Sequence, residues 1–534
     1  MKPFLITTAI DYTNGAPHLG HAYEKVLADV LARFHRQAGE EVFFLTGVDQ
    51  HGQKVQQSAE REGIAPQEYV DGVTAKFRAL WEKLGISFDG WAATTAERHK
   101  DCVRAVLTRL WEDRDPSTGE SRWIYKAARS GHYSIRQEQF LTDKERGPDG
   151  EFGPEWGQVE FREEENYYFR LASQRQWLLD MIDARSAAQR PFVIPSFRVA
   201  ELRNAVEKLD GDLCISRPKS RLSWGIGFPF DPEFVTYVWF DALVNYISFA
   251  PGYDPVPSRP PEEFLRFWRT VVHDIGKDIL IPAHGVYWPV MLKALGFADD
   301  EMPTLLVHGW WNISGAKMSK SLGNTVDPDA LADRYGANAL RYYLMADIAT
   351  GRDADFSEER LVQRYNVDLA NGLGNLVNRT LNMTLKYREG SPASPAFAED
   401  LAAHLASNDE ALLGHGRSMR EGQVQAALEC LSEVVTRANA LVDASAPWKL
   451  AKDPELAERL DAVLSVLLLS ARTAATMLLP VLPEAAAEIL KQLNLKSEPF
   501  AMNALPELPE GYRCGEPKPV FPRLELAAEE DAAA

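Results

Sequence analysis

The order of apolar and polar positions over the first fifty residues predicts the start of a parallel α/β sheet. A short apolar run, FLITTAI at 4–10, ends at Asp11 and predicts a buried strand. Apolar side chains then recur at helical spacing from Leu19 to about Gln37, and a second apolar run, EVFFLTG, leads to Asp49. Strand, helix and strand in this order indicate a parallel sheet, whose ligands bind beyond the carboxyl ends of the strands.

The middle of the chain predicts an insertion into this sheet. Between about residues 114 and 223 the pattern loosens into turn-rich stretches such as RDPSTGES. Sheet-like runs return at 234–244 (FVTYVWFDALV), 278–282 (DILIP) and 304–311 (TLLVHGWW). We therefore expect the parallel sheet to be completed far along the chain, so that the domain containing it is split in two.

From about Glu358 onward the apolar spacing is helical. One face of a predicted helix is traced at i, i+3 and i+4 spacing by Val424, Ala427, Leu428, Leu431, Val435, Ala438 and Val442. A further helix is predicted from Pro454 to Leu479, where Pro480 ends it. The sequence thus predicts an α/β domain followed by a bundle of helices.

Composition describes an acidic globular chain. Its 534 residues, 45% hydrophobic and 25% charged, are enough for roughly three or four domains. No run approaches the ~18 apolar residues of a membrane span, and Asp11 interrupts the N-terminal run before it reaches the length of a secretory signal. We expect a cytoplasmic protein with no membrane partner. The net charge of −19, taken alone, disfavours nucleic acid as a partner.

The four cysteines predict a reducing compartment and no structural zinc. They are Cys102, Cys214, Cys430 and Cys514, and no two of them have CxxC spacing.

A first motif predicts a phosphate site at the start of the first helix. His18, Gly20 and His21 belong to the string PHLGH at 17–21, between the first strand and its helix. The N–H groups of a helix N-terminus attract anions, imidazoles donate to developing charge, and a glycine allows adenine to approach the backbone. In isolation, the two histidines are equally compatible with a surface or metal-binding pair.

A second motif lies about 300 residues downstream. Lys317, Ser319 and Lys320 belong to the string KMSKS at 317–321, in a loop flanked by glycines. Two lysines in such a loop can neutralise a polyphosphate as pyrophosphate leaves, although a lone Lys/Ser loop is most often only solvated. The two motifs together form a specific signature.

With both motifs the sequence resembles the class I aminoacyl-tRNA synthetases, whose HIGH motif is here HLGH and whose KMSKS motif appears letter for letter. Within that class it is similar to the methionyl-tRNA synthetase family, from Phe4 to about Asn494. The supporting strings are DYTNG at 11–15, TGVDQHG at 46–52, YVWFDA at 237–242 and IGKDI at 275–279.

The resemblance implies a two-step ligase reaction. Methionine attacks the α-phosphate of ATP, which enters with Mg²⁺, to give methionyl-adenylate and pyrophosphate. The methionyl group then passes to the 3′ end of tRNA(Met), including the initiator tRNA. The residues that the family pattern assigns to ATP are His18, Gly20, His21, Lys317, Ser319 and Lys320, of which the two histidines and two lysines are the catalytic set.

The resemblance also implies a methionine pocket. Asp49 matches the carboxylate that holds the substrate's ammonium group, with a helix cap as its alternative role, and Arg217 matches a family arginine near the active site. The side-chain slot maps onto Ala9, Ile10, Tyr12, Trp239, Ala242, Leu243, Tyr246, Ile279 and His284. We expect the Tyr246 hydroxyl to donate to the sulfur of the substrate.

The helical region resembles the family's anticodon-binding domain. RNA loops are recognised by stacking bases on aromatic rings and by reading their edges with polar side chains. Trp448 is the strongest candidate for stacking on the anticodon CAU. Asn366, Asn371, Asn375 and Arg379 are candidates for reading base edges, and the last two are equally compatible with contacts inside the bundle.

The implied fold is a Rossmann-like parallel-sheet catalytic domain, split by a connective insert and followed by an α-helical bundle that binds the anticodon. The expected segments are 1–114 and 224–308 for the two catalytic halves, 115–223 for the insert, 309–357 for the KMSKS loop and stem-contact region, 358–505 for the bundle and 506–534 for the tail.

Two positions depart from the family pattern. Many members carry zinc knuckles with CxxC pairs in the insert, whereas this chain has none between Trp123 and Gln158, so we expect a form without zinc in which packing replaces the metal. Leu213 stands where some members have an aromatic residue that closes the pocket.

Two alternatives remain. Another class I synthetase is disfavoured because the leucine, isoleucine and valine enzymes need a longer chain for editing and the cysteine enzyme uses zinc ligands absent here. A synthetase-like RNA-binding protein without activity should lack a signature histidine or lysine, whereas all four are present. Family members that dimerise often use an extra C-terminal RNA-binding domain, whereas this chain ends soon after the predicted helices. We therefore expect a monomer.

Overall fold

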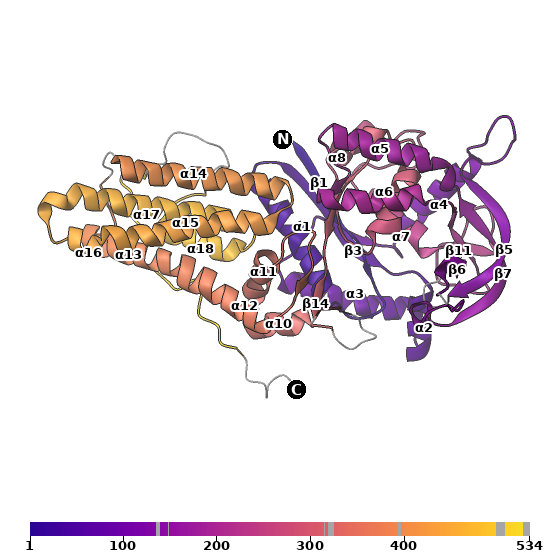
Figure 1. Ribbon diagram of the computed structural model, residues 1–534, viewed down its shortest axis with the longest axis horizontal. Coiled ribbons are helices and arrows are strands. Elements are labelled where there is room, and N and C mark those ends of the chain that lie inside the picture. Colours follow the sequence, from indigo (N-terminus) through magenta and orange to yellow (C-terminus); the bar gives the residue numbers. More distant parts are fainter. Residues whose placement is uncertain are drawn as a thin grey trace.

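A parallel sheet forms the centre of one half of the molecule, and a helical bundle extends away from it (Figure 1). The computed structural model describes residues 1–134, 139–141, 143–147, 149–313, 315–318, 325–393, 397–497 and 508–526. The main sheet contains β1 (Pro3–Thr8), β2 (Asp11–Tyr12), β3 (Glu41–Asp49), β4 (Gly90–Ala93), β8 (Val193–Ile194), β12 (Val272–Gly276) and β13 (Thr304–His308).

The strand order is β2-β3-β1-β12-β13-β8, with β4 also paired to β3, and every pairing is parallel. The Rossmann-like sheet expected from the sequence is therefore confirmed, and the strands from the start of the chain meet those from the later part where β1 pairs with β12. All carboxyl ends lie at one edge, where ligands of such sheets bind.

The helices of the α/β region pack on the sheet, as α1 and α8 do, or on one another, as α2 and α3 do. They are α1 (Leu19–Gln37), α2 (Gln53–Glu62), α3 (Pro66–Lys83), α4 (Glu97–Glu112), α5 (Arg175–Ala187), α6 (Val199–Glu207), α7 (Val238–Ser248), α8 (Glu262–Trp268) and α9 (Trp288–Ala294). The sequence predicted α1 with the bounds that the structure has, and its apolar residues Val26, Val30 and Phe34 are fully buried.

Two sheet-like runs were wrongly interpreted as strands. Of 234–244, only β11 (Phe234–Thr236) is a strand, and it pairs antiparallel with β10 (Ser216–Pro218) rather than joining the main sheet. The rest begins α7, in which residues 240–248 are all buried, so no polar face marks the helical period. The run 278–282 follows β12 and enters a wide helical turn, η5 (Leu280–Tyr287).

The insert forms a small antiparallel sheet at the end of the molecule opposite the bundle (Figure 1). Its strands are β5 (Ile124–Ser134), β6 (Gln139–Leu141), β7 (Val159–Phe169) and β9 (Leu213–Cys214), in the order β6-β5-β7-β9. Leu213, in β9, is buried in the core. The segment expected to be the insert also supplies β8 and α5 to the main fold, because β8 pairs with β13 at the edge of the parallel sheet.

A short sheet and two helices connect the α/β region to the bundle. They are β14 (Trp311–Ile313), β15 (Ala316–Lys317), β16 (Ala354–Asp355), α10 (Pro328–Tyr335) and α11 (Ala337–Ala346). The bundle itself contains α12 (Glu358–Arg364), a wide helical segment η8 (Tyr365–Gly374), α13 (Asn375–Arg388), α14 (Glu399–Arg420), α15 (Val424–Ser445), α16 (Pro447–Leu450), α17 (Ala457–Leu478) and α18 (Pro483–Leu493).

The apolar pattern predicted the bundle correctly. Every residue of the predicted face on α15 is buried, and the helix predicted from Pro454 is formed by a short turn followed by α17. Among the described helices, the stretch Pro454–Leu478 is long and apolar enough to cross a membrane, but 94% of its apolar window is buried inside the protein. Its apolar surface is therefore used for packing in the bundle.

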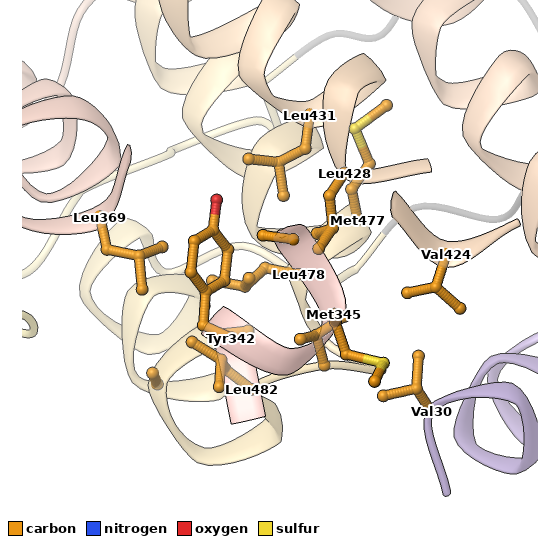
Figure 2. Close-up of a cluster of buried hydrophobic side chains, with 14 of the residues drawn as sticks. Val30, Tyr342, Met345, Leu369, Val424, Leu428, Leu431, Met477, Leu478 and Leu482 are labelled. Atoms are coloured by element: carbon orange, nitrogen blue, oxygen red, sulfur yellow. The ribbon is translucent and has the colours of Figure 1, made fainter. Parts of the chain in front are cut away.

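Buried side chains join the bundle to the helix that begins with HLGH. Figure 2 shows Val30 of α1 next to Met345 of α11, in a buried cluster that also contains Leu369 of η8 and Leu428 of α15. Arg341 of α11 adds polar links, since its guanidinium contacts Asp29 of α1 at 2.7 Å and also donates to the carbonyl oxygen of Val481. The two halves of the molecule are thus one packed body.

Candidate functional site

An apolar cavity of about 280 Å³ opens at the carboxyl edge of the sheet, between β1, β3 and α7. It is lined by Ala9, Ile10, Tyr12, Asp49, Lys54, Tyr237, Val238, Trp239, Ala242, Leu243, Asn245, Tyr246, Ile279 and His284. The structure therefore brings together every residue predicted for the amino-acid pocket except Arg217. The guanidinium of Arg217 lies over the ring of Tyr237, 4.2 Å from its centroid, next to the cavity wall.

One wall of the cavity carries a hydrogen-bonded pair. Nε2 of His284 lies 2.7 Å from the Tyr246 hydroxyl, and Nδ1 of His284 lies 2.9 Å from the carbonyl oxygen of Ile279. Burial lowers the pKa of His284 to about 4, so the ring is neutral. Since a carbonyl only accepts, Nδ1 carries the hydrogen, and Tyr246 donates to Nε2. In this state the Tyr246 hydrogen is not available to a sulfur atom.

Asp49 provides a carboxylate at the end of β3. It is 6% exposed, and its Oδ1 accepts from the backbone N–H of His51 and from the hydroxyl of Thr94, both at 3.3 Å. It does not cap the following helix, because α2 begins after Gly52, which is its N-cap. The structure thus disfavours the capping alternative and leaves a buried carboxylate beside an apolar slot.

Lys54 is a lining residue that the sequence reasoning missed. It stands in the first turn of α2, is solvent-exposed, and is the only Lys or Arg among the lining residues of the first cavity. The sequence feature that could have identified Lys54 as a lining residue is its position five residues after Asp49. An amino acid carries one charge of each sign, so the Asp49 and Lys54 pair matches both ends of its backbone.

A buried network fixes the wall opposite β1. Asp241 of α7 accepts from Nδ1 of His51 at 2.7 Å and from Nε2 of His99 at 2.8 Å. Burial raises the pKa of Asp241, but the two histidines outweigh it and lower that pKa to about 2. The charged carboxylate therefore ties α7, which carries Trp239 and Tyr246, to the loop after β3 and to α4.

A second cavity, of about 340 Å³, adjoins the first and shares Ala9, Ile10, Tyr12 and Ile279 with it. Its other lining residues are Asp11, His18, Gly20, His21, Glu24, Gly276, Asp278, His308, Gly309, Trp310, Trp311 and Met318. The HLGH residues predicted for a nucleotide thus lie directly beside the amino-acid cavity.

The histidines of HLGH are oriented by the backbone of α1. His18 is the N-cap, and its Nδ1 accepts from the N–H of Gly20 at 3.1 Å, while Nδ1 of His21 accepts from the N–H of His18 at 3.0 Å. Each neutral ring therefore carries its hydrogen on Nε2, where it can donate to an anion. In the described part of the chain, no three His, Cys, Asp or Glu side chains gather as metal ligands.

Buried charges form the floor of the second cavity. Lys25 is fully buried and contacts Asp11 at 2.6 Å and Glu24 at 2.8 Å. His308 faces two acceptors, the Glu24 carboxylate at 3.1 Å and the carbonyl oxygen of Gly309 at 2.8 Å, so both ring nitrogens donate. Burial lowers the pKa of His308, but Glu24 and Asp274 outweigh it and raise that pKa to about 9.

A family model described as tRNA synthetases class I (M) matches residues 4–149 and 156–381. This chain belongs to the class I methionyl-tRNA synthetase family. It is 39% identical to the methionine–tRNA ligase of Deinococcus radiodurans over 99% of this chain and 76% of that protein. It is also 39% identical to the enzyme of a Streptococcus pyogenes serotype M18 strain, over 99% of this chain and 79% of the relative.

Solved structures of this synthetase family have the same fold. The Mycobacterium tuberculosis methionyl-tRNA synthetase in complex with methionyl-adenylate superposes with a TM-score of 0.87 at 36% identity, covering 98% of this chain and all of that one. The apo form of the same enzyme gives a TM-score of 0.82 at 34% identity, with 99% of each chain covered.

The KMSKS motif of this synthetase is only partly within the described residues. Lys317 lies in β15, paired with Asn312 of β14, and Met318 lines the second cavity. Ser319 and Lys320 lie outside the described residues, as does the side chain of Lys317. The roles predicted for these lysines therefore stay predictions.

Of the residues predicted to bind the anticodon, some are exposed to solvent and others are partly buried or paired within the bundle. Trp448 is 41% exposed on α16, at the end of the bundle far from the sheet (Figure 1), and Asn371 is exposed on η8. Asn375 is half-buried at the start of α13, and Arg379 pairs with Asp443 at 3.0 Å.

Asn366 does not match the prediction. Its amide donates to the carbonyl oxygen of Leu524 at 2.8 Å and accepts from the N–H of Leu524 at 2.9 Å. Asn366 therefore holds the C-terminal segment against the bundle, and its amide edge is not presented to a base.

Proposed function

We propose that the chain is a methionine–tRNA ligase, which activates L-methionine with MgATP and transfers the methionyl group to tRNA(Met), initiator tRNA included. The observation that carries this proposal is the adjacency of the two cavities. They share Ala9, Ile10, Tyr12 and Ile279, so an amino acid in the first presents its carboxylate to a nucleotide in the second. Positioning of this kind supplies much of the rate in a reaction without a covalent enzyme intermediate.

The first cavity selects the amino acid. Asp49 binds the ammonium group and Lys54 binds the carboxylate until it attacks phosphorus. The apolar wall, with Trp239 and Leu243, receives the side chain, and the Tyr246 and His284 pair limits its length. An unbranched thioether fits a narrow apolar slot.

The second cavity binds the nucleotide. His18 and His21 donate from Nε2 to the phosphates of MgATP, and Gly20 lets the adenine approach the backbone. Lys317 and Lys320 neutralise the charge that develops as pyrophosphate leaves. Lys320→Ala is therefore expected to slow adenylate formation more than it weakens methionine binding.

The bundle recognises the tRNA. Trp448 stacks on a base of the anticodon CAU, while Asn371, Asn375 and Arg379 read base edges, with Arg379 leaving Asp443 on binding. We also propose that the protein is a cytoplasmic monomer with no membrane partner. The burial of its most apolar helix inside the bundle supports only the last of these points.

The insert in this proposal is held by packing and contains no zinc. Its core includes Ile124, Tyr167, Phe169 and Leu213, and the ring of Trp123 stacks on that of Phe169. The two cysteines nearest to the insert sheet, Cys102 and Cys214, lie in α4 and β9 without a third metal-ligand partner among the described residues.

Charging of tRNA(Met) with radiolabelled methionine tests the whole proposal. We expect ATP-dependent transfer to tRNA(Met) with release of AMP. Trp448→Ala is expected to reduce charging while leaving the first step intact, because Trp448 lies in the bundle, away from both cavities. Equal loss in both steps would show that Trp448 is structural, and absence of charging by the unaltered enzyme would refute the proposal.

A further inference from the structure

A surface of paired cations and aromatic rings lies beside the nucleotide cavity, and the proposed function assigns it no role in amino-acid activation or anticodon recognition. Lys277 follows β12, Trp310 follows β13, and Phe197 follows β8. These three strands are neighbours in the parallel sheet, so the three residues stand at one edge. With Arg352, which packs on Phe197, we call them the carboxyl-edge surface.

Each ring of this surface faces a cation. Nζ of Lys277 lies 3.8 Å from the centroid of the Trp310 ring, and the guanidinium carbon of Arg352 lies 4.5 Å from that of Phe197. Phe197 is 47% exposed, which is unusual for a phenylalanine, and Arg352 has no ion-pair partner among the described residues. Cations over exposed rings favour a flat ligand that carries negative charge.

The backbone holds this surface rigidly. Asp353 accepts from Nζ of Lys277 at 2.5 Å and from the N–H of Trp310 at 2.9 Å. A side chain at Gly309 would collide with the carbonyl oxygen of Arg352, and one at Gly351 (φ +90°) would collide with Pro195. The segment carrying Arg352 therefore sits directly on the ends of β13 and β8, and little order has to be gained when a ligand binds.

Its position relative to the cavities identifies the ligand. The strand order places the amino-acid cavity on the β3 and β1 side, the nucleotide cavity at β1, β12 and β13, and the carboxyl-edge surface on the β8 side. Trp310 belongs to both the nucleotide cavity and the surface, and its Nε1 donates to Asp278 of that cavity at 3.2 Å. A ligand on the surface thus reaches the edge of the nucleotide cavity.

We propose that the carboxyl-edge surface binds the single-stranded 3′ end of the tRNA, with a base stacked on Phe197 and a phosphate contacting Arg352. This inference rests on the proposed function, because that function requires a terminal adenosine to reach the adenylate. Unpaired bases stack on aromatic rings and their phosphates attract arginine, whereas a duplex offers no exposed base faces.

Binding of two tRNAs tests the inference. Affinity for intact tRNA(Met) is compared with affinity for the same tRNA lacking its terminal CCA, for the unaltered enzyme and for Phe197→Ala. We expect removal of CCA to lower the affinity of the unaltered enzyme for the tRNA. Phe197→Ala should lower the affinity for intact tRNA(Met) about tenfold and leave the affinity for the truncated tRNA unchanged. Arg352→Gln should show the same selectivity.

Two controls make the outcome readable. Trp448→Ala is expected to lower the affinity for both tRNAs by the same factor, because the anticodon is present in each. Phe197→Leu, which keeps apolar volume but removes the ring, should behave like Phe197→Ala, and both variants should retain methionine-dependent ATP–pyrophosphate exchange, which reports that they are folded.

Three results would overturn the inference: equal weakening of both tRNAs by Phe197→Ala, no weakening of either, or no effect of CCA removal on the unaltered enzyme. Failure of the unaltered enzyme to bind or charge tRNA(Met) at all would instead refute the proposed function.

Discussion

The hydroxyl of Tyr246 donates to Nε2 of His284 across 2.7 Å, because Nδ1 of the same ring donates to the carbonyl oxygen of Ile279. The neutral ring, with its pKa lowered by burial to about 4, therefore has one stable orientation near neutral pH. We propose that Tyr246 contacts the substrate through its apolar face and positions His284, while its hydrogen stays with Nε2 of His284 rather than going to the sulfur.

Tyr246→Phe tests this arrangement. The change leaves Nε2 of a buried histidine without its donor, which costs about 1–3 kcal/mol and loosens the slot. We expect kcat/KM for adenylate formation to fall about tenfold with methionine. L-norleucine, in which a methylene replaces the sulfur, should lose the same factor. A loss confined to methionine would mean that the hydroxyl contacts the sulfur directly.

Lys54→Gln tests the contact with the substrate carboxylate. Removing this cation should raise the KM for methionine by roughly three- to tenfold, because Lys54 is exposed and its attraction is screened. Inhibition by L-methioninol, which has no carboxylate, should stay unchanged. The control is Lys100→Gln, a partly exposed lysine of α4 that pairs with Glu97, and this variant should change neither value. Equal weakening of methionine and methioninol would contradict the assignment.

His308 predicts a pH dependence of stability. Its pKa is raised from 6.5 to about 9 in the folded protein, so its stabilising charge is fully present below about pH 6.5 and is lost as the pH rises through 9. The unfolding free energy of the unaltered enzyme should exceed that of His308→Gln at pH 6, and the difference should shrink by about 3 kcal/mol by pH 10. Urea denaturation of both proteins at several pH values measures the difference in unfolding free energy. A difference that stays constant from pH 6 to pH 10 would contradict the charge assigned to His308.

Elemental analysis tests the zinc-free insert. We expect purified enzyme to contain far less than one zinc per chain, because the insert core is apolar and aromatic. It should also keep its activity after a chelator has been added and removed and Mg²⁺ has been supplied again with the ATP. A content of about one zinc per chain would overturn this interpretation.

The sequence predicted the elements in which apolar and polar positions alternate clearly. The predicted face of α15 lies opposite a polar side that reaches solvent, so its helical period is visible. In α1 the period is visible because polar residues such as Lys25 and Asp29 separate the apolar ones, although both are buried in ion pairs. The prediction from the apolar pattern failed for α7, in which residues 240–248 are all buried and β-branched and aromatic residues are common. A fully buried helix has no polar stripe, and its residues are the ones that also favour strands.

Residues predicted from motif strings line the two cavities, whereas contacts between distant parts of the chain could not be predicted. Asn366 meets Leu524, 158 residues away, and His51 meets Asp241, 190 residues away, and neither pair has a local sequence signal. Lys54 was missed because an exposed lysine on a helix is ordinary. Arg217 belongs to a motif near the cavity, but its guanidinium packs on Tyr237 behind the wall.

Amino-acid-dependent ATP–pyrophosphate exchange, measured with a panel of amino acids and without tRNA, decides whether the enzyme activates methionine. The two adjoining cavities predict exchange with L-methionine well above that with leucine, isoleucine, valine or cysteine, and loss of exchange in Asp49→Asn. Absence of exchange with methionine, or faster exchange with another amino acid of the panel, would contradict the account.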